Sequence, residues 1–152
     1  MKLKLLSFDD LKIFEDIDVK ILSFSEYEKT IYLFEDDINK FIIKSSSDLV
    51  KPKVLICNDL YWIGADQKVI IISSDGEILK EINLISNFYT FEQIKRDRIA
   101  LISELETHIY DSLNLKCFEK IIFEDLLLDY IMHETFIEMI LYNNKKFIVR
   151  YS

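Results

Sequence analysis

The chain of 152 residues is poor in the residues that build nucleotide sites, with two glycines, Gly64 and Gly76, one proline and two histidines. A dinucleotide fingerprint and a phosphate-cradling loop each need several glycines so that the backbone can approach the phosphates closely. The pair His133-Glu134 begins like a zinc-protease helix, but Ile137 occupies the position of the second histidine ligand. We therefore expect no cofactor and no metal site.

Only two cysteines are present, Cys57 and Cys117, and they stand 60 positions apart. This spacing offers neither a disulfide framework nor the paired thiols of a metal knuckle. Free cysteine behaves as a small hydrophobic residue, so we expect both side chains to be reduced and buried.

Long hydrophobic runs are also missing. The aliphatic run Val69–Ile72 is far shorter than the roughly 20 residues that cross a bilayer, which predicts that there is no transmembrane helix. The segment Met1–Leu6 opens like a secretory signal, but Asp9 and Asp10 interrupt it before an adequate apolar stretch or a cleavage site is reached. Together with the unpaired cysteines, this predicts a cytoplasmic protein.

Basic residues are outnumbered, since 27 acids against 19 bases give a formal net charge of −8. Binding to nucleic acid or to an anionic membrane needs a basic face, so the charge argues against both kinds of partner. Exposed acids commonly serve solubility and protect strand edges, but an acidic face also steers a basic protein partner. The acidic clusters are Asp9-Asp10, Glu15-Asp16 with Asp18, Glu35-Asp36-Asp37, and Glu124-Asp125 with Asp129.

What the chain does contain is a series of four hydrophobic hairpins. Their turns lie near Asp36-Asp37, Asp75-Gly76, Leu113-Asn114 and Asn143-Asn144, at intervals of roughly 39, 38 and 30 residues. A recurrence of this length is typical of stacked or propeller-like repeats. The paired apolar segments are Ile31–Phe34 with Ile38–Ile43, Val69–Ile72 with Ile78–Leu84, His108–Tyr110 with Leu115–Ile122, and Phe136–Tyr142 with Phe147–Tyr151.

Short runs of β-branched and aromatic residues, bounded by turn formers, predict strands from residue 19 to the end of the chain. Asp75-Gly76 is the strongest hairpin signal, because both residues tolerate the positive φ of a type I′ turn. The apolar spacing of Phe8–Ile17 predicts one short helix, whereas Phe88–Ile94 has similar spacing and is open between strand and helix. The predicted fold class is all-β, with antiparallel blade-like sheets in an open, half β-propeller-like arrangement. We expect a single domain over residues 1–152 with three to four β-meander repeats.

One stretch resembles a blade of a known propeller type. Leu60–Gly64, followed by Lys68–Ile70 and closed by Asp75-Gly76, is similar to one blade of a tyrosine–tryptophan-repeat or NHL β-propeller. The chain departs from that pattern at Ile63 and Gly64, which stand where a Thr-Asp pair would follow the tryptophan.

The chain as a whole is small, acidic and strand-rich, is biased toward Ile, Lys, Asn and Phe, and has no catalytic motif. In this it resembles the immunity proteins of bacterial contact-dependent inhibition and related polymorphic toxin systems. The resemblance implies a cytoplasmic protein that is not an enzyme. It also implies a single partner, a basic toxin domain such as a nuclease, whose active-site cleft is covered by acidic residues. The alternatives are a propeller-like protein-interaction scaffold and a small hydrolase of unknown class.

An interface of this kind needs exposed aromatic anchors beside acids. Tyr61 and Trp62 are adjacent and therefore point to opposite faces of a strand, so one of them is a candidate for exposure. Tyr130 beside Asp125 and Asp129 suits an aromatic anchor ringed by charge. The candidate toxin-binding residues are Glu35, Asp36, Asp37, Tyr61, Glu124, Asp125, Asp129 and Tyr130.

Two residue combinations would instead be compatible with an enzyme. His108 and Cys117 could meet across a hairpin as base and nucleophile, although a turn-flanking histidine and a core cysteine is the favoured interpretation. Paired carboxylates for glycoside hydrolysis exist among the 27 acids, but no spacing selects a pair.

Overall fold

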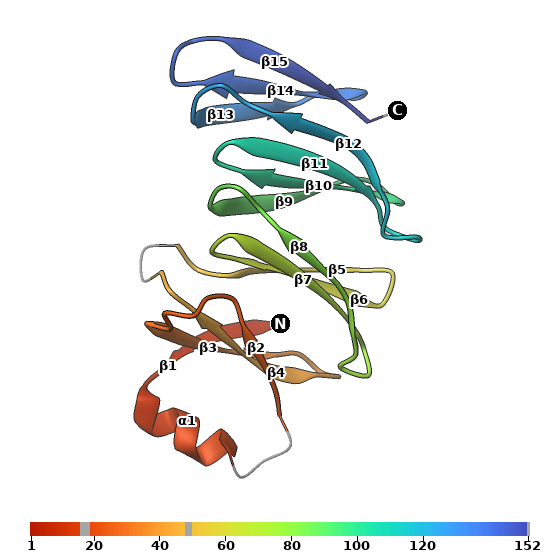
Figure 1. Cartoon of the computed structure of the whole chain (residues 1–152). Helices are drawn as coiled ribbons and strands as arrows, with labels where there is room; N and C mark the ends of the chain where they lie inside the picture. Colours follow the sequence, from red (N-terminus) through yellow and green to blue (C-terminus); the bar gives the residue numbers. More distant parts are fainter. Residues whose placement is uncertain (16–18, 48–49, 152) are drawn as a thin grey trace. The chain divides into compact units, whose positions relative to one another are not determined.

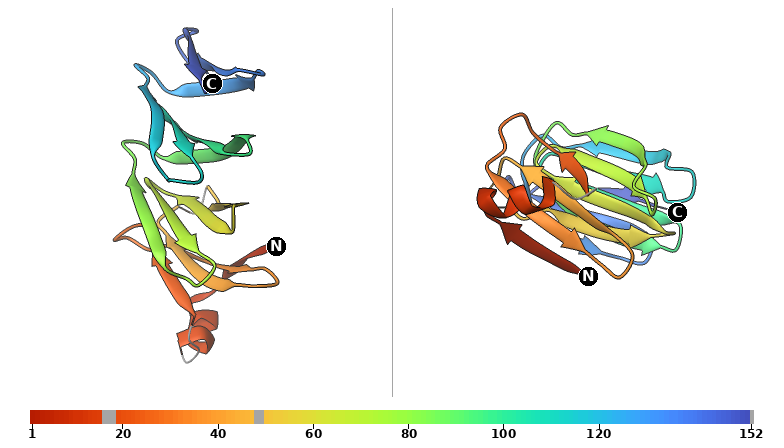
Figure 2. Two further views of the ribbon diagram at one scale, coloured as in Figure 1. Left: turned by 90° about the vertical axis from the view of Figure 1, so that its right-hand side faces the viewer. Right: turned by 90° about the horizontal axis from the view of Figure 1, so that it is seen from below.

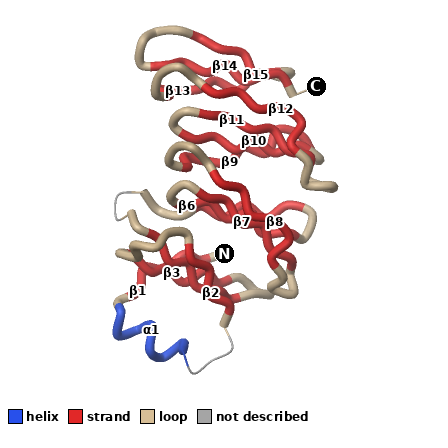
Figure 3. The backbone as a smooth tube through the Cα atoms, in the orientation of Figure 1, coloured by secondary structure: helices blue, strands red, loops and turns tan. Residues whose placement is uncertain are grey.

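The computed structural model describes residues 1–15, 19–47 and 50–151 (Figure 1). Within these residues it contains fifteen strands and one helix, arranged as four separate sheets. Backbone contacts divide the chain into two compact units, Met1–Ile82 and Asn83–Ser152, and each unit holds two of the sheets. Figure 3 shows how strands dominate both units.

The first sheet of the N-terminal unit has the strand order β1-β3-β4-β2. Its members are β1 (Lys2–Leu6), β2 (Lys20–Ser23), β3 (Thr30–Glu35) and β4 (Lys40–Ser45). The hairpin predicted around Asp36-Asp37 is confirmed as β3 and β4, but β2 pairs with β4 in parallel, which the antiparallel prediction did not include. Strand β1 was missed by the sequence analysis, because its alternating lysines and leucines were read as the start of a signal segment.

Helix α1 (Phe8–Glu15) follows β1 and confirms the short helix expected in this region, while residues 16 and 17 lie outside the described part. Its start is fixed by a capping box. The amide of Asp10 donates to Ser7 Oγ at 3.1 Å, and the amide of Ser7 donates to Asp10 Oδ2 at 3.0 Å. Leu11 then packs against Ile31 and Ile42, on one face of the first sheet.

The second sheet has the order β5-β6-β7-β8, from β5 (Lys53–Cys57), β6 (Leu60–Ala65), β7 (Lys68–Ser73) and β8 (Ile78–Asn83). The hairpin at Asp75-Gly76 is confirmed, but its type I′ assignment is wrong. Only Gly76 has a positive φ, of 84°, and the Ser73 amide donates to the Glu77 carbonyl across a three-residue loop. A type I′ turn requires two consecutive residues with positive φ. Such a pair is found between β5 and β6, where Asn58 and Asp59 have φ of 52° and 59°.

The core of the N-terminal unit lies between these two sheets. Phe34 and Phe41 stack with ring centroids 4.5 Å apart, and the Tyr61 ring meets both edge-on at 5.7 Å. Neither Tyr61 nor Trp62 is exposed, so neither is the exposed aromatic anchor for which this pair was a candidate. The rest of this core is Leu22, Phe24, Tyr32, Ile43, Ile63, Ala65, Ile70 and Ile72.

The C-terminal unit stacks a four-stranded sheet, order β12-β11-β10-β9, against a three-stranded one, order β13-β14-β15 (Figure 2). Their bounds are β9 (Phe88–Lys95), β10 (Arg98–Ser103), β11 (Glu106–Asp111), β12 (Cys117–Ile122), β13 (Leu127–Met132), β14 (Phe136–Leu141) and β15 (Lys146–Arg150). The segment Phe88–Ile94, open between strand and helix in sequence, is therefore a strand. Ala100, Ile102, Met139 and Val149 fill the space between the two sheets.

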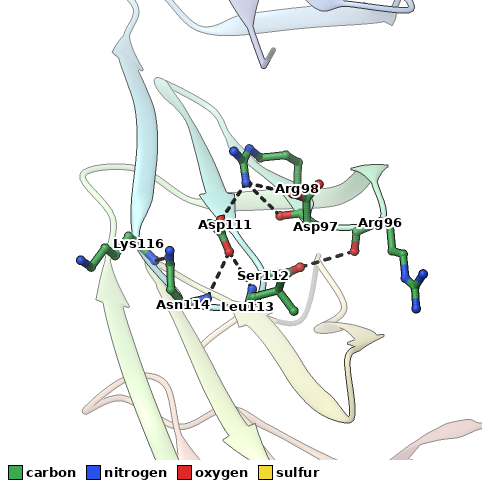
Figure 4. A network of polar contacts seen from close by, with 8 residues as sticks. All are labelled: Arg96, Asp97, Arg98, Asp111, Ser112, Leu113, Asn114 and Lys116. Atoms are coloured by element: carbon green, nitrogen blue, oxygen red, sulfur yellow. Dashed lines mark hydrogen bonds and ion pairs between the residues drawn. The ribbon is translucent and has the colours of Figure 1, made fainter.

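A polar network closes one end of the four-stranded sheet (Figure 4). Arg98 Nη1 lies 2.8 Å from Asp111 Oδ2 and 3.5 Å from Asp97 Oδ2. Asp111 Oδ1 accepts hydrogen bonds from the amides of Leu113 and Asn114 at 2.8 and 3.1 Å. These amide donors, and then Arg98, hold the pKa of Asp111 below its ordinary value. The network ties the β9–β10 and β11–β12 turns to each other.

The all-β fold class predicted from the sequence is confirmed. In its described residues the protein consists of blade-like sheets of three or four strands and one short helix. Each of the four predicted hairpins belongs to a different sheet, and each sheet is open, with two edge strands. Helix α1 has eight residues, and among the described residues no helix is long and apolar enough to cross a membrane.

Candidate functional site

The C-terminal unit contains a hollow of about 290 Å³, which we call the tyrosine hollow. Its wall is formed by the start of β9, the β10–β11 turn, strand β13 with the residue before it, and the residue after β14. The lining residues are Tyr89, Glu104, Leu126, Leu127, Leu128, Asp129, Tyr130 and Tyr142. It brings together Asp129 and Tyr130 from the sequence prediction with residues from three other parts of the chain.

Backbone hydrogen bonds place β13 beside the β10–β11 turn. The Leu127 amide donates to the Glu104 carbonyl at 2.8 Å, and the Phe123 amide donates to the Leu105 carbonyl at 2.7 Å. The Tyr142 amide donates to the Leu126 carbonyl at 3.0 Å and brings the end of β14 to the same place. The hollow is therefore fixed by main-chain pairing and not by side chains alone.

Tyr130 is held by two residues of β9. Its phenol donates a hydrogen bond of 2.7 Å to Glu92 Oε1, and its ring meets the Tyr89 ring edge-on at a centroid distance of 6.4 Å. Burial, and then the hydrogen bond to Glu92, raise the pKa of Tyr130. Its phenol therefore stays protonated at neutral pH and keeps its hydrogen bond to Glu92. Tyr142, by contrast, is 61% exposed at the rim.

The hollow is acidic. Glu104 and Asp129 line it, Glu92 lies behind Tyr130, and none of the lining residues in the described chain is basic. Asp129 Oδ1 accepts the amide hydrogen of Tyr130 at 2.8 Å, and Glu104 Oε2 accepts a long hydrogen bond of 3.3 Å from the Asn87 side chain. Both carboxylates thus lie beside the aromatic rings of the hollow.

The two other acids predicted in this region lie next to the hollow. The Lys145 ammonium forms an ion pair of 2.5 Å with Glu124, and this contact is the main cause of the lowered pKa of Glu124. Asp125 Oδ1 accepts a hydrogen bond from the Leu126 amide. Glu124 is therefore ion-paired with a lysine, whereas in the described part of the chain Asp129 forms no ion pair.

The N-terminal acids lie in a different unit, at the β3–β4 turn. Together with Met1 and Lys2, Glu35, Asp36 and Asp37 line a smaller hollow of about 190 Å³, in which Lys2 offsets part of the acidity. Glu35 also forms an exposed ion pair of 3.4 Å with Lys40. The two acidic regions of the prediction are thus separate features of two compact units.

Tyr61 contacts the β3–β4 turn from the core of the N-terminal unit. Its side chain is 3% exposed, and its phenol donates to Asp36 Oδ2 at 2.6 Å. Burial opposes ionisation of Asp36, but the hydrogen bond from Tyr61 and those from the Asn39 and Ile38 amides lower its pKa overall. Because its ring is packed against Phe34 and Phe41, any part that Tyr61 plays in an interface is indirect, through the position of Asp36.

The candidate base and nucleophile do not meet. His108 is buried with Nε2 3.2 Å from Glu106 Oε1, and in the strand register it lies opposite Lys120. Cys117 lies opposite Tyr110 and is exposed, so the prediction of a buried thiol is wrong there and confirmed only for Cys57. In the described part of the chain, no three histidine, cysteine or acidic side chains are grouped so that they could hold a metal ion.

The sequence analysis missed Tyr89 and Glu104, which line the hollow, and Glu92, which accepts the hydrogen bond of Tyr130. They come from β9 and from the β10–β11 turn, more than 20 positions before β13. Nothing local marks them, because they reach Tyr130 only when the three-stranded sheet stacks on the four-stranded one.

No known protein family and no curated protein sequence matches the chain. Among solved structures, it is similar to one chain of the S. cerevisiae complex of Dbp5 with Nup159 and Gle1, at 7% identity and a TM-score of 0.46, over 87% of this chain and 41% of that one. It is also similar to AztD from Citrobacter koseri (9% identity, TM-score 0.46, 87% and 43%) and to Kluyveromyces lactis Hsv2 (12%, 0.41, 67% and 34%). The chain therefore spans less than half the length of each of these chains. Likenesses at this distance add nothing to the functional argument.

Proposed function

We propose that this protein is an immunity protein that binds a basic toxin domain, a nuclease, and blocks its active site by steric and electrostatic occlusion. The observation that carries the proposal is the tyrosine hollow, where three tyrosines and two carboxylates meet without a lining base. Aromatic side chains at the centre of an interface, ringed by polar groups, are the usual anchors of protein binding.

The chemistry of the hollow suits a cationic side chain. A lysine or arginine over a tyrosine ring gains about 0.5–2 kcal/mol from the cation–π interaction, and a carboxylate at hydrogen-bond distance adds a charge-assisted contact. A nuclease presents such cations because it must hold phosphates. Asp129 and Glu104 would then occupy the place of phosphate oxygens and keep the substrate out.

The net charge of −8 also favours a basic partner, because it attracts positive charge over a long range. Opposite net charges raise the association rate by about one to three orders of magnitude at low salt, and the gain falls as salt screens the field. Fast association is what an inhibitor of a lethal enzyme requires. We propose that it acts in the cytoplasm, the compartment that the sequence predicts.

Co-expression with the toxin domain encoded beside this gene tests the proposal in cells. We expect the wild-type protein to restore growth, and the double variant Glu104→Gln with Asp129→Asn to restore it poorly. Glu77→Gln with Glu81→Gln is the matched control, because it removes the same charge from exposed positions around the start of β8 and should protect like wild type. Failure of the wild-type protein to protect, or equal protection by both double variants, would reject the proposal.

A further inference from the structure

The eight edge strands of the four sheets are not alike. An exposed sheet edge is a template for pairing with another chain, and proteins commonly block it with lysine. Among the described strands, seven of the eight edges carry at least one lysine or arginine, and β13 is the exception. Each of these seven strands has a lysine, namely Lys2 in β1, Lys20 in β2, Lys53 in β5, Lys80 in β8, Lys95 in β9, Lys120 in β12 and Lys146 in β15.

Strand β13 also exposes apolar side chains at this edge. Leu128, Ile131 and Met132 are 50%, 44% and 37% exposed, and Asp129 is the one charged residue of the strand. The register irregularity in its pairing with β14 is confined to Leu127/Asp129, so the strand is regular from Asp129 to Met132. The Leu127 amide is already paired with the Glu104 carbonyl, so the part of this edge that is open to strand addition is Leu128–Met132. Within it, the Tyr130 amide donates to Asp129 Oδ1 of its own strand, and an added strand would replace that contact.

The same strand forms a wall of the tyrosine hollow, through Leu127, Leu128, Asp129 and Tyr130. A segment paired along β13 would run directly past the hollow, and a strand presents every second side chain to one face. Main-chain hydrogen bonds and a side-chain pocket would then act on one extended peptide, a combination on which strand-adding recognition domains rely.

We propose that β13 accepts an extended segment of a basic protein partner as an added strand, with a lysine or arginine of that segment seated in the tyrosine hollow. We choose a basic occupant because Glu104 and Asp129 line the tyrosine hollow and none of its lining residues is basic. A second copy of this chain fits poorly. Antiparallel self-pairing of Leu127–Met132 would bring two Asp129 carboxylates to facing or diagonal positions, and both chains carry a net charge of −8.

The identity of the partner as a toxin rests on the proposed function, but the strand addition does not, and a synthetic probe separates the two. The probe is a fluorescein-labelled heptapeptide of alternating lysine and valine, and its binding is followed by fluorescence anisotropy. Its matched control has the same sequence with alternate backbone amides N-methylated. The control keeps every charge but cannot donate hydrogen bonds along one edge.

We expect the unmodified peptide to bind and the N-methylated peptide to bind at least about tenfold more weakly. Ile131→Lys supplies the missing edge lysine and should weaken binding of the unmodified peptide by a similar factor of about ten. Ile148→Lys is the control, because Ile148 is 51% exposed on β15, an edge that already carries lysine, and its affinity should match wild type. Circular dichroism of both variants verifies that they are folded.

Equal binding of the two peptides, equal affinity of the two variants, or no peptide binding would overturn the strand addition. A β13-paired dimer of wild type that Ile131→Lys dissolves in light scattering would overturn the choice of occupant. Growth protection by Ile131→Lys at the wild-type level would leave the proposed function in place and reject the strand addition. Peptide binding without toxin protection would do the reverse.

Discussion

The phenol of Tyr130 in β13 donates a 2.7 Å hydrogen bond to the carboxylate of Glu92 in β9, across 38 positions of sequence. The contact joins the edge strands of the two sheets that stack in the C-terminal unit, and it orients the ring that forms one wall of the tyrosine hollow. The site therefore depends on how the two sheets are held together.

Replacing Tyr130 by Phe removes this hydrogen bond and keeps the ring. We expect the free energy of unfolding to fall by about 0.5–1.5 kcal/mol, the usual net value of one hydrogen bond, measured by urea denaturation. Tyr142→Phe removes an exposed phenol and should change the stability by less than about 0.5 kcal/mol. Indistinguishable midpoints for the two variants would show that the Tyr130–Glu92 bond does not hold the sheets.

The buried pair His108–Glu106 predicts a loss of stability in mild acid. Burial lowers the pKa of His108, and this effect outweighs the opposing influence of Glu106, while nearby Lys120 lowers the pKa further. The unfolded chain then binds a proton below about pH 6.5 that the folded chain does not, so the stability falls as the pH drops below that value.

Urea denaturation of wild type and His108→Gln at pH 8, 6.5 and 5.5 measures this effect. Between pH 6.5 and 5.5 the stability of wild type should fall, and that of His108→Gln should fall less. Ordinary aspartates and glutamates titrate near pH 4 and contribute little in this window. Parallel curves for the two proteins would contradict the assignment.

The Arg98–Asp111 network in Figure 4 predicts a graded effect of substitution. Asp111→Asn keeps an oxygen that can accept from the Leu113 and Asn114 amides but loses the charge that faces Arg98. Asp111→Ala loses both. Thermal unfolding midpoints should therefore rank wild type above Asp111→Asn and Asp111→Asn above Asp111→Ala. If Asn and Ala lower the midpoint equally, the amide contacts contribute nothing and the ion pair alone matters.

Tyr61→Phe tests the link between the core and the acidic β3–β4 turn. Loss of the phenol removes one of the hydrogen bonds that lower the pKa of Asp36, so this pKa should rise toward its ordinary value. A titration of the Asp36 carboxyl carbon by NMR measures the shift, with Asp111 in the other unit as an internal reference whose pKa should not change. An unchanged Asp36 pKa would mean that the backbone amides alone set it.

Much of the fold was predictable because period-2 alternation and turn residues are local signals. The four hairpins followed from apolar runs around Asp36-Asp37, Asp75-Gly76 and the two later turns, and the structure confirms all four. The parallel pairing of β2 with β4 could not be predicted, because strand order depends on contacts between distant segments. The turn at Asp75-Gly76 was misassigned because Asp-Gly is compatible with both a type I′ turn and a three-residue loop that needs one positive φ.

The candidate site was also predictable only in part. Asp129 and Tyr130 were found because they are near each other in sequence, whereas Glu104 and Tyr89 join them only through the stacking of two sheets. The burial of Tyr61 was open in the sequence, since a tyrosine in an alternating strand suits a core or a surface equally well. Its role became clear only from the Phe34 and Phe41 rings around it.

The central claim is that the acidic tyrosine hollow holds a basic protein partner. Isothermal titration of the purified toxin domain encoded beside this gene, at 50 and 300 mM NaCl, tests it most directly. We expect tight binding that weakens strongly with salt, and a much smaller salt dependence and lower affinity for Glu104→Gln with Asp129→Asn than for Glu77→Gln with Glu81→Gln. Binding that is indifferent to salt and equal for the two double variants would contradict the account.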